Sequence, residues 1–443
     1  MPDLNDELRD LADEAARHAR PLPVADVIRQ GDRRHQPAVT LWPLRRARKP
    51  RRATQARPGR RWPGWVAPLA AAAAVIAVVA GTAAVSSAIH GRRAAAGASP
   101  AHRVIAYVVD SESGTVTPIR TATNTPLPPI NTGDNSDTIA ITPDGKTVYV
   151  ANYVYRGGTV TPIRTATNTA LRPIKTGRTP AAIAITPDGK TAYVANFDSG
   201  TVTPIRTAAN TALPPIKTGS DPVTIAITPD GKTAYVANNG SGTVTPIRTA
   251  TNKALRPIKV GPHPDAIAIT PDGGTVYVAN DIHAGTVTPI RTATNKALPP
   301  IKTGYDSAAI AITPDGKTAY VVNLGLYPKI PGTVTPIQTA TNTALPPINI
   351  GGLSANIAIT PDGKTVYVPA GGVVTPIRTA TNTPLPPINV GGISAGIAIT
   401  PDGKTAYVAN MLSGKVTPIR TATNTPLPPI KTGLRPIAIA IAP

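Results

Sequence analysis

The sequence has no cysteine and very few aromatic residues. Phenylalanine occurs once, and the three tryptophans all precede residue 66. Without cysteine, neither a disulfide nor a thiolate metal site can form. A core in the remainder of the chain must therefore be aliphatic, packed from Ile, Val, Leu and Ala side chains.

Acidic residues are missing from a long segment. None occurs between Asp32 and Asp110, and the whole chain carries a formal net charge of +21. A basic balance is compatible with nucleic-acid binding. Aromatic and basic residues do not alternate, however, and no helix suited to a DNA groove is apparent, so we expect no nucleic-acid partner.

Residues 66–89 read VAPLAAAAAVIAVVAGTAAVSSAI, a run of 24 residues without a charge. An α-helix of this length extends roughly 36 Å, enough to cross a hydrocarbon core of about 30 Å. Trp62 and Trp65 precede it, where interfacial aromatic residues are common. We predict a transmembrane helix over residues 65–89.

Eleven positive charges lie within residues 33–61. The positive-inside rule therefore places the N-terminus in the cytoplasm and the C-terminal bulk outside it. We expect a single-pass protein of the cell membrane, with a mostly disordered basic tail over residues 1–64 and a linker over residues 90–102. A cleaved signal peptide is the alternative, because AAAGASPA after the span contains small residues suited to cleavage.

From residue 103 onward the sequence is nearly periodic. TPIRTATN or a close variant begins at residues 117, 161, 203, 245, 288, 335, 375 and 417. A period in the low forties, built from strand-like pieces, is typical of β-propeller blades. The unit that begins at residue 181 predicts four strands: AAIAIT, TAYVAN after a PDGK turn, GTVTPI and ALPPIKTG. Proline suits an outer edge in the fourth strand, and in the third it suggests a bulge or an early end of pairing.

These residues resemble the YVTN β-propeller repeat, of the membrane-anchored actinobacterial type. PDGKTAYVAN at residues 187–196 and TATN at residues 121–124 match its motifs closely. The chain departs from the repeat before Thr-Ala-Thr-Asn, where Asp is usual and seven units here have Arg and the eighth has Gln338. The resemblance implies the fold and binding at the cell surface, but a ligand role of an acidic turn does not carry over.

The periodic region begins and ends inside a unit. RVIAYVVDSESGTVTPI, from residue 103, aligns with KTAYVANFDSGTVTPI from the second strand of a unit, and the chain ends with the first-strand sequence IAIAIA. Pairing of the two ends would complete one sheet and close the ring. We therefore predict an all-β, eight-bladed β-propeller over residues 103–443, closed by the C-terminal strand and monomeric.

Comparison of the eight units separates two faces. The turns between first and second and between third and fourth strands are nearly constant, whereas the loops at the other end of the blades differ in length and residue type. Variable loops on a rigid scaffold are where recognition is usually found, although unconstrained loops also drift. The predicted partner-binding residues on this face are Tyr153, Tyr155, Arg156, Phe197, Asp198, Tyr305, Asp306, Tyr327 and Lys329.

The residues of the repeats form no recognisable catalytic motif. His263, Asp265, Asp281 and His283 fall in successive variable loops and are metal-ligand types, but no fixed spacing supports a site. We expect no cofactor and no enzymatic activity. The predicted function is a binding scaffold for a cell-wall polymer or an envelope protein; the alternative is a lactonase-like or hydrolase-like enzyme with a metal near the channel mouth.

Overall fold

Eight antiparallel sheets make up the part of the chain that the structure describes. This computed structural model describes residues 104–154, 157–281, 285–326 and 329–442, and all forty of its strands belong to these sheets. The predicted tail, transmembrane helix and linker lie outside the described residues. No helix within the described ranges is long and apolar enough to cross a membrane.

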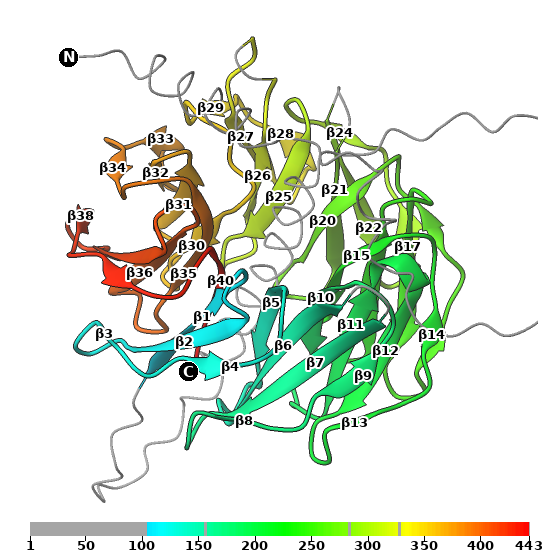
Figure 1. The fold of residues 1–443 in the computed structure, drawn as a ribbon. Coiled ribbons are helices and arrows are strands. Elements are labelled where there is room, and N and C mark those ends of the chain that lie inside the picture. The colour runs from blue at the N-terminus through cyan, green and yellow to red at the C-terminus, as the bar shows by residue number, and fades with distance from the viewer. Residues whose placement is uncertain (1–103, 155–156, 282–284, 327–328, 443) are drawn as a thin grey trace, which may run out of the picture. The chain divides into compact units, whose positions relative to one another are not determined.

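Each sheet is one blade, and its strands run outward from the ring centre in chain order (Figure 1). The innermost strands of blades 1 to 8 are β40 (Pro436–Ile441), β5 (Ser136–Ile141), β10 (Pro180–Ile185), β15 (Pro222–Ile227), β20 (Pro264–Ile269), β25 (Ser307–Ile312), β30 (Ala358–Ile359) and β35 (Ser394–Ile399). The second strands are β1 (Ile105–Asp110), β6 (Thr147–Val154), β11 (Thr191–Asn196), β16 (Thr233–Asn238), β21 (Thr275–Asn280), β26 (Thr318–Asn323), β31 (Thr365–Ala370) and β36 (Thr405–Asn410).

The third strands are β2 (Thr115–Arg120), β7 (Gly157–Arg164), β12 (Thr201–Arg206), β17 (Thr243–Arg248), β22 (Thr286–Arg291), β27 (Thr333–Gln338), β32 (Val373–Arg378) and β37 (Lys415–Arg420). Two short outer pieces follow in each blade: β3 (Thr125–Pro126) and β4 (Ile130–Asn131), β8 (Thr169–Ala170) and β9 (Ile174–Thr176), β13 (Thr211–Ala212) and β14 (Ile216–Lys217), β18 (Lys253–Ala254) and β19 (Ile258–Lys259), β23 (Lys296–Ala297) and β24 (Ile301–Lys302), β28 (Thr343–Ala344) and β29 (Ile348–Asn349), β33 (Thr383–Pro384) and β34 (Ile388–Asn389), β38 (Thr425–Pro426) and β39 (Ile430–Lys431). A short 3-10 helix, η1 (Phe197–Ser199), follows β11.

The C-terminal strand closes the ring, as predicted. β40 pairs antiparallel with β1, with Ala106 opposite Ile441 and Val109 opposite Ala438; in Figure 1 the red β40 lies beside the cyan β1. Each hydrophobic cluster joins facing sides of neighbouring blades, with Ile and Ala of the innermost strands packed on buried Val and Tyr. The prediction of an eight-bladed all-β propeller is confirmed.

A tyrosine hydroxyl ties each blade to the next. The tyrosine of every second strand is at most 1 % exposed, and its hydroxyl donates to an asparagine side chain in the following blade at 2.5–2.8 Å. Each of these asparagines is the last residue of the Thr-Ala-Thr-Asn turn (Thr-Ala-Ala-Asn in blade 3) and adopts a left-handed conformation, which asparagine tolerates better than most residues. Tyr407 of blade 8 donates to Asn124 of blade 1 and completes the series.

The outer edge differs from the prediction. Two pieces of two or three residues replace the single fourth strand, because Leu-Pro-Pro or Leu-Arg-Pro separates them and proline has no N–H for the ladder. The third-strand proline needs neither a bulge nor an early end of pairing. Pro118 lies opposite Tyr107 in an unbroken register, and its carbonyl accepts from the Leu127 N–H at 2.8 Å. The nitrogen of Pro118 points to the same side, toward the outer edge of the blade. The outer strand is interrupted there, so the missing N–H of Pro118 costs no hydrogen bond.

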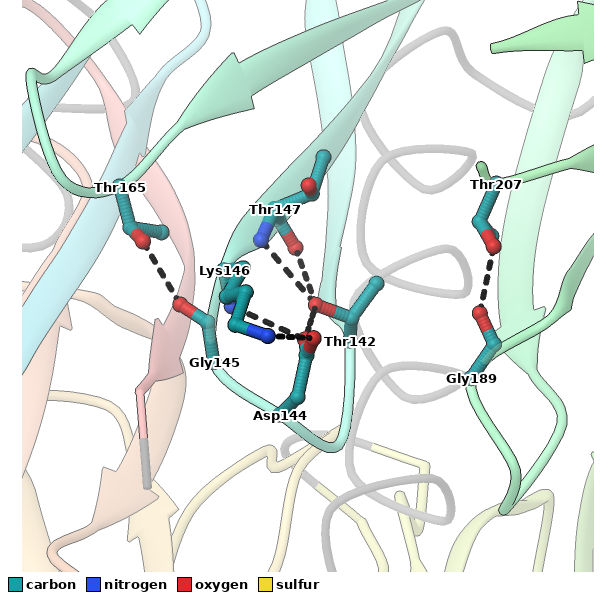
Figure 2. Close-up of polar contacts among 8 residues, drawn as sticks. All are labelled: Thr142, Asp144, Gly145, Lys146, Thr147, Thr165, Gly189 and Thr207. Carbon is teal, nitrogen blue, oxygen red and sulfur yellow. Dashed lines mark hydrogen bonds and ion pairs between the residues drawn. The ribbon is translucent and has the colours of Figure 1, made fainter. Parts of the chain in front are cut away.

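The Pro-Asp-Gly-Lys turns form a constant face (Figure 2). The Asp144 carboxylate accepts from the Thr142 hydroxyl at 2.7 Å and from the Lys146 backbone N–H at 3.1 Å, which fixes the turn. The Thr165 hydroxyl donates to the Gly145 carbonyl at 2.7 Å and ties the next turn of the same blade to it. The Lys146–Asp144 ion pair is exposed, so it adds little to stability.

Blade 1 carries a buried carboxylate where six blades have asparagine. In those blades the asparagine amide donates to a third-strand threonine, as Asn410 does to Thr417 at 2.8 Å. In blade 1, Asp110 accepts from Thr117 at 2.6 Å through one oxygen, and its other oxygen has no hydrogen-bond partner among the described residues. Burial raises the pKa of Asp110 above its usual range, and hydrogen bonds from Thr117, Thr432, the Gly433 backbone and Thr115 offset part of this effect.

We expect Asp110→Asn to stabilise the protein by about 1–2 kcal/mol at pH 7, because a neutral amide restores the pairing of the other blades. Because the pKa of Asp110 is higher in the folded than in the unfolded protein, the neutral acid does not destabilise the fold at low pH. The free energy of unfolding falls as the pH rises from the unfolded-state pKa to the folded-state pKa. The gain should therefore shrink at pH 4. Urea unfolding at both pH values measures it, with Asn410→Asp as the reverse substitution in blade 8. Equal midpoints for wild type and Asp110→Asn at pH 7 would contradict this account.

Candidate functional site

The variable loops surround the channel mouth at one end of the blades. The antiparallel order places the loop after each second strand and the loop before each innermost strand at the same end. Loops between second and third strands range from two residues in blade 7 (371–372) to nine in blade 6 (324–332). This end of the propeller therefore differs from blade to blade, unlike the constant face.

Two rings of residues line this mouth. The rim residues precede the innermost strands, directly in every blade but blade 7, where Leu353 lies five residues before β30. The second-ring residues directly follow the second strands, except that Tyr153 lies near the end of β6. Within every blade, the second-ring N–H donates to the rim carbonyl at 2.8–3.3 Å. The rim residues of blades 1 to 8 are Arg435, Asn135, Thr179, Asp221, His263, Asp306, Leu353 and Ile393; the second-ring residues are Ser111, Tyr153, Phe197, Asn239, Asp281, Leu324, Gly371 and Met411.

Six rim residues, those of blades 1 to 6, have left-handed backbone conformations, with φ between 49° and 56°. Asparagine and aspartate adopt this region readily, but for the β-branched Thr179 it is a genuine outlier. Such strain persists only where the surroundings enforce it. The rim is therefore held in one conformation and presents its side chains in fixed directions.

Two aspartates face each other at the rim between blades 5 and 6, and the charge of a third acts on them. The carboxyl groups of the second-ring Asp281 and of the rim Asp306 in the next blade are near enough to interact. Two carboxylates held close together repel each other, which favours a proton on one of them. Burial, followed by the negative charges of Asp265 and Asp306, raises the pKa of Asp281 well above its usual range. The pair is thus arranged to keep one proton where isolated carboxyls would both be ionised.

Asp265 lies on the innermost strand β20, at a β-bulge between Pro264 and Ala266. It is only 7 % exposed, and burial raises its pKa to about 7. Its carboxylate accepts no hydrogen bond within the described part of the chain. A buried carboxylate without compensation is costly to the fold, so Asp265 destabilises the propeller when it is ionised. Asp265, Asp281 and Asp306 are called the acid cluster below.

The rim residue His263 also contacts a second-ring residue of the preceding blade. The Nδ1 atom of His263 lies 3.1 Å from the Asn239 Oδ1, which belongs to the second ring of the preceding blade. Beside it is an open hollow of about 500 Å³, lined by Asn239, Gly240, Ser241, Gly242, Lys259, Gly261, Pro262 and His263. His263 is therefore part of the mouth but contacts an amide rather than the acid cluster.

Asp137 is a functional candidate that the sequence reasoning missed. It occupies in β5 the position of Asp265 in β20, and burial raises its pKa to about 6 even though Arg435 and Ser111 counteract the shift. The other blades have Ala, Val or Ile at this position. An acid at an otherwise apolar position of the innermost strand was the signal that could have revealed it.

The structure brings together residues that were predicted for different roles. Asp265 and Asp281 were candidate metal ligands and Asp306 a partner-binding candidate, yet all three belong to one cluster. No group of three or more His, Asp or Glu in the described ranges is arranged to hold a metal ion. His283 lies outside these ranges, so the expectation that His263, Asp265, Asp281 and His283 form no metal site stays a prediction.

The remaining partner-binding candidates are dispersed. Phe197 is half-buried against the core between blades 4 and 5, and the exposed Asp198 accepts from the Thr179 hydroxyl. Tyr153 is half-buried in the second ring and Lys329 is exposed. Tyr155, Arg156 and Tyr327 lie outside the described residues.

Comparison with known proteins supports a β-propeller family. Residues 99–214, roughly a quarter of the chain, match a family model described as "Lactonase, 7-bladed beta-propeller". The match ends in blade 3, and this ring has eight blades rather than seven. No curated protein matches the sequence, and the more specific resemblance to the YVTN repeat stays a prediction.

Similar solved structures include hydrazine synthase of Kuenenia stuttgartiensis, which is 25 % identical with a TM-score of 0.55 over 64 % of this chain and 95 % of that one. The dihydro-heme d1 dehydrogenase NirN in complex with DHE is 16 % identical, with a TM-score of 0.65 over 80 % of this chain and 78 % of that one. A functionally unknown protein from Desulfotomaculum acetoxidans is 19 % identical, with a TM-score of 0.56 over 76 % and 98 %. The last two likenesses concern the fold alone.

The prediction that the chain has no enzymatic activity is wrong. The matched family model is described as a lactonase, and hydrazine synthase, the similar structure at 25 % identity, is named as an enzyme. The prediction relied on the lack of a local catalytic motif. The acid cluster has no such motif, because Asp265 and Asp281 come from one blade and Asp306 precedes the next.

We expect Asp265→Asn to change how stability depends on pH. The folded-state pKa of about 7 lies above the usual aspartate value. The wild type should therefore lose about 1.4 kcal/mol per pH unit as the pH rises from the ordinary value toward 7, with no further loss from this residue above it. Asp265→Asn should remove this slope and be the more stable protein at pH 8.

Unfolding by urea at pH 4, 6 and 8 measures the effect. Asp134→Asn is the matched control, because Asp134 is an exposed loop aspartate of blade 2. Parallel pH curves for wild type and Asp265→Asn would contradict the raised pKa.

Proposed function

We propose that the protein is a hydrolase that cleaves an ester or lactone bond at the acid cluster. The observation that carries the proposal is the pair of interacting carboxyl groups of Asp281 and Asp306, on which the charge of the buried Asp265 also acts. A pair with one proton contains a general acid and a general base at the same place. The lactonase description of the matched family model supports this reaction class.

The pair has the groups that hydrolysis needs. The ionised carboxylate accepts a proton from water, and the water oxygen attacks the carbonyl carbon to form a tetrahedral intermediate. The bond to the leaving alkoxide oxygen then breaks as the neutral carboxyl donates its proton to that oxygen. One carboxyl gains a proton and the other loses one, so the pair ends with one proton as it began.

Asp265 acts as a positioning residue in this scheme. Its negative charge raises the pKa of Asp281 and keeps a proton on the pair. The enclosed position of Asp265 also makes this charge more effective than it would be in water. Removing the charge should therefore lower the pH at which the pair loses its proton.

Hydrolysis of a series of γ-lactones, δ-lactones and aryl esters by the purified protein tests the proposal. Asp281→Asn and Asp306→Asn should each lower kcat/KM by about 10²–10⁴-fold, whereas Asp134→Asn should leave it unchanged. Asp265→Asn should retain activity and move the alkaline limb of the pH–rate profile to lower pH. Wild-type hydrolysis no faster than that of Asp281→Asn on every substrate would refute the proposal.

A second candidate function concerns location and partners. We propose that residues 65–89 anchor the protein in the cell membrane and that the propeller lies outside the cytoplasm, where its variable loops bind a cell-wall polymer or an envelope protein. The range of loop lengths on this face, from two to nine residues, supports such recognition. The eleven positive charges of residues 33–61 support the orientation.

Because the chain has no cysteine, single introduced cysteines report the topology without background. A membrane-impermeant maleimide added to intact cells should label Glu112→Cys, in an exposed loop of blade 1, but not Arg46→Cys in the basic tail. Lysis before labelling should make both sites reactive. Labelling of Arg46→Cys alone in intact cells would reverse the proposed orientation.

A further inference from the structure

The exposed large hydrophobic side chains gather on one part of the variable face. Six such side chains occur among the described residues, and every one lies in a loop of this face, in blades 6, 7, 8 and 1. They form what we call the apolar arc: Leu326, Ile330, Leu353, Ile393, Leu412 and Leu434. Single exposed hydrophobic residues are common on proteins, but their concentration on one face of neighbouring blades points to a binding surface.

The apolar arc begins directly beside the acid cluster. Leu353 occupies in blade 7 the rim position that Asp306 occupies in blade 6, and Ile393 holds it in blade 8; their carbonyls accept the same second-ring hydrogen bonds, at 3.3 Å and 2.8 Å. Leu353 thus follows Asp306 in the next blade along the rim. Along the rim, the carboxyl pair Asp281–Asp306 is therefore followed in the next two blades by Leu353 and Ile393, whose side chains are 43 % and 41 % exposed.

The local structure of blade 7 leaves space above these side chains. Pro369 has no N–H for the innermost strand, and β30 is accordingly only two residues long. The loop at residues 371–372 has no side chains, and a Cβ added at Gly371 or Gly351 would meet no atom within 4 Å. The short loop of blade 7 lies between the longer loop of blade 6, which carries Leu326 and Ile330, and the loop of blade 8, which carries Leu412.

We propose that Leu353 and Ile393 bind the aliphatic chain of the substrate, so that the site selects esters or lactones with an alkyl substituent over small or polyhydroxylated ones. The inference rests on the proposed hydrolase and names its substrate class. An alkyl chain is the favoured occupant because the apolar arc is continuous with the reacting carboxyls: a chain attached to a carbonyl group at Asp281 and Asp306 can follow the rim onto Leu353 and then Ile393.

Hydrolysis of aryl esters with acyl chains of two to twelve carbons by the full chain tests this. The measured quantity is the ratio of kcat/KM between wild type and the Leu353→Ser/Ile393→Ser variant at each chain length, because this ratio cancels partitioning of long esters into detergent. It should be near one for the acetyl ester and reach about tenfold for chains of eight or more carbons, as buried methylene groups add to binding. Leu171→Ser, at the outer edge of blade 2 and outside the arc, is the matched control and should behave as wild type.

A measurement without turnover separates this inference from the proposed reaction. A decanoyl amide carrying an alkyl diazirine, which has no ester bond, is photolysed with the full chain and its adducts are mapped by mass spectrometry. Adducts at residues 351–354 and 391–394, absent from the double variant, are expected.

Such adducts without hydrolysis of any ester would overturn the hydrolase and leave an alkyl-binding surface. Hydrolysis whose variant ratio stays near one at every chain length would overturn the inference and leave the hydrolase. Adducts only at Leu412 and Leu434 would also overturn it and would favour a protein partner for the arc.

Discussion

The hydrogen bond from each second-strand tyrosine to an asparagine of the following blade is the constraint on which the rest of the propeller depends. Backbone ladders hold each blade together internally, but the Ile, Ala and Val contacts between blades are non-directional. A buried hydroxyl that must reach one amide oxygen defines both the angle and the height of the next blade. The asparagine meets this demand only in its left-handed turn, which explains why the Thr-Ala-Thr-Asn sequence barely varies while the loops at the opposite end do.

Because the blades are evenly spaced, the chemical character of the channel mouth can differ from one pair of neighbouring blades to the next. In two sectors a rim residue meets the second ring of the blade before it, and the two side chains lie some 25 residues apart in the sequence: Asp281 with Asp306, and Asn239 with His263. A substitution in one pair changes one sector and leaves the ring intact. The sectors of this protein differ accordingly: acidic between blades 5 and 6, and aliphatic in blades 7 and 8.

The sequence was sufficient for the features that depend on local pattern. The period, the Pro-Asp-Gly-Lys turns and the incomplete units at both ends predicted eight blades and the pairing of β40 with β1. Features that depend on contacts between blades could not be read in the same way. The sequence gives no sign that Asp281 and Asp306 interact, because the contact joins the second ring of one blade to the rim of the next. The raised pKa of Asp265 results from burial at a β-bulge, which no sequence motif marks. The prolines in the sequence indicated that the outer strand is interrupted. That this interruption leaves no hydrogen-bond partner opposite the nitrogen of Pro118 could be seen only from the strand register.

The seam between β40 and β1 has a further consequence for how copies of this chain interact at high concentration. The two strands are held by the same kind of hydrogen bonds and aliphatic contacts as the other strand pairs, and no covalent link joins them, because the chain lacks cysteine. A ring that opens at the seam exposes an edge on β1 and a detached β40, and the β40 of a second molecule fits that edge equally well. Reciprocal exchange of this strand would give intertwined dimers in which each propeller keeps its eight blades. Because such dimers bury no new surface, their amount is set by concentration and by the rate at which the seam opens, and they persist after dilution for as long as the seam stays closed.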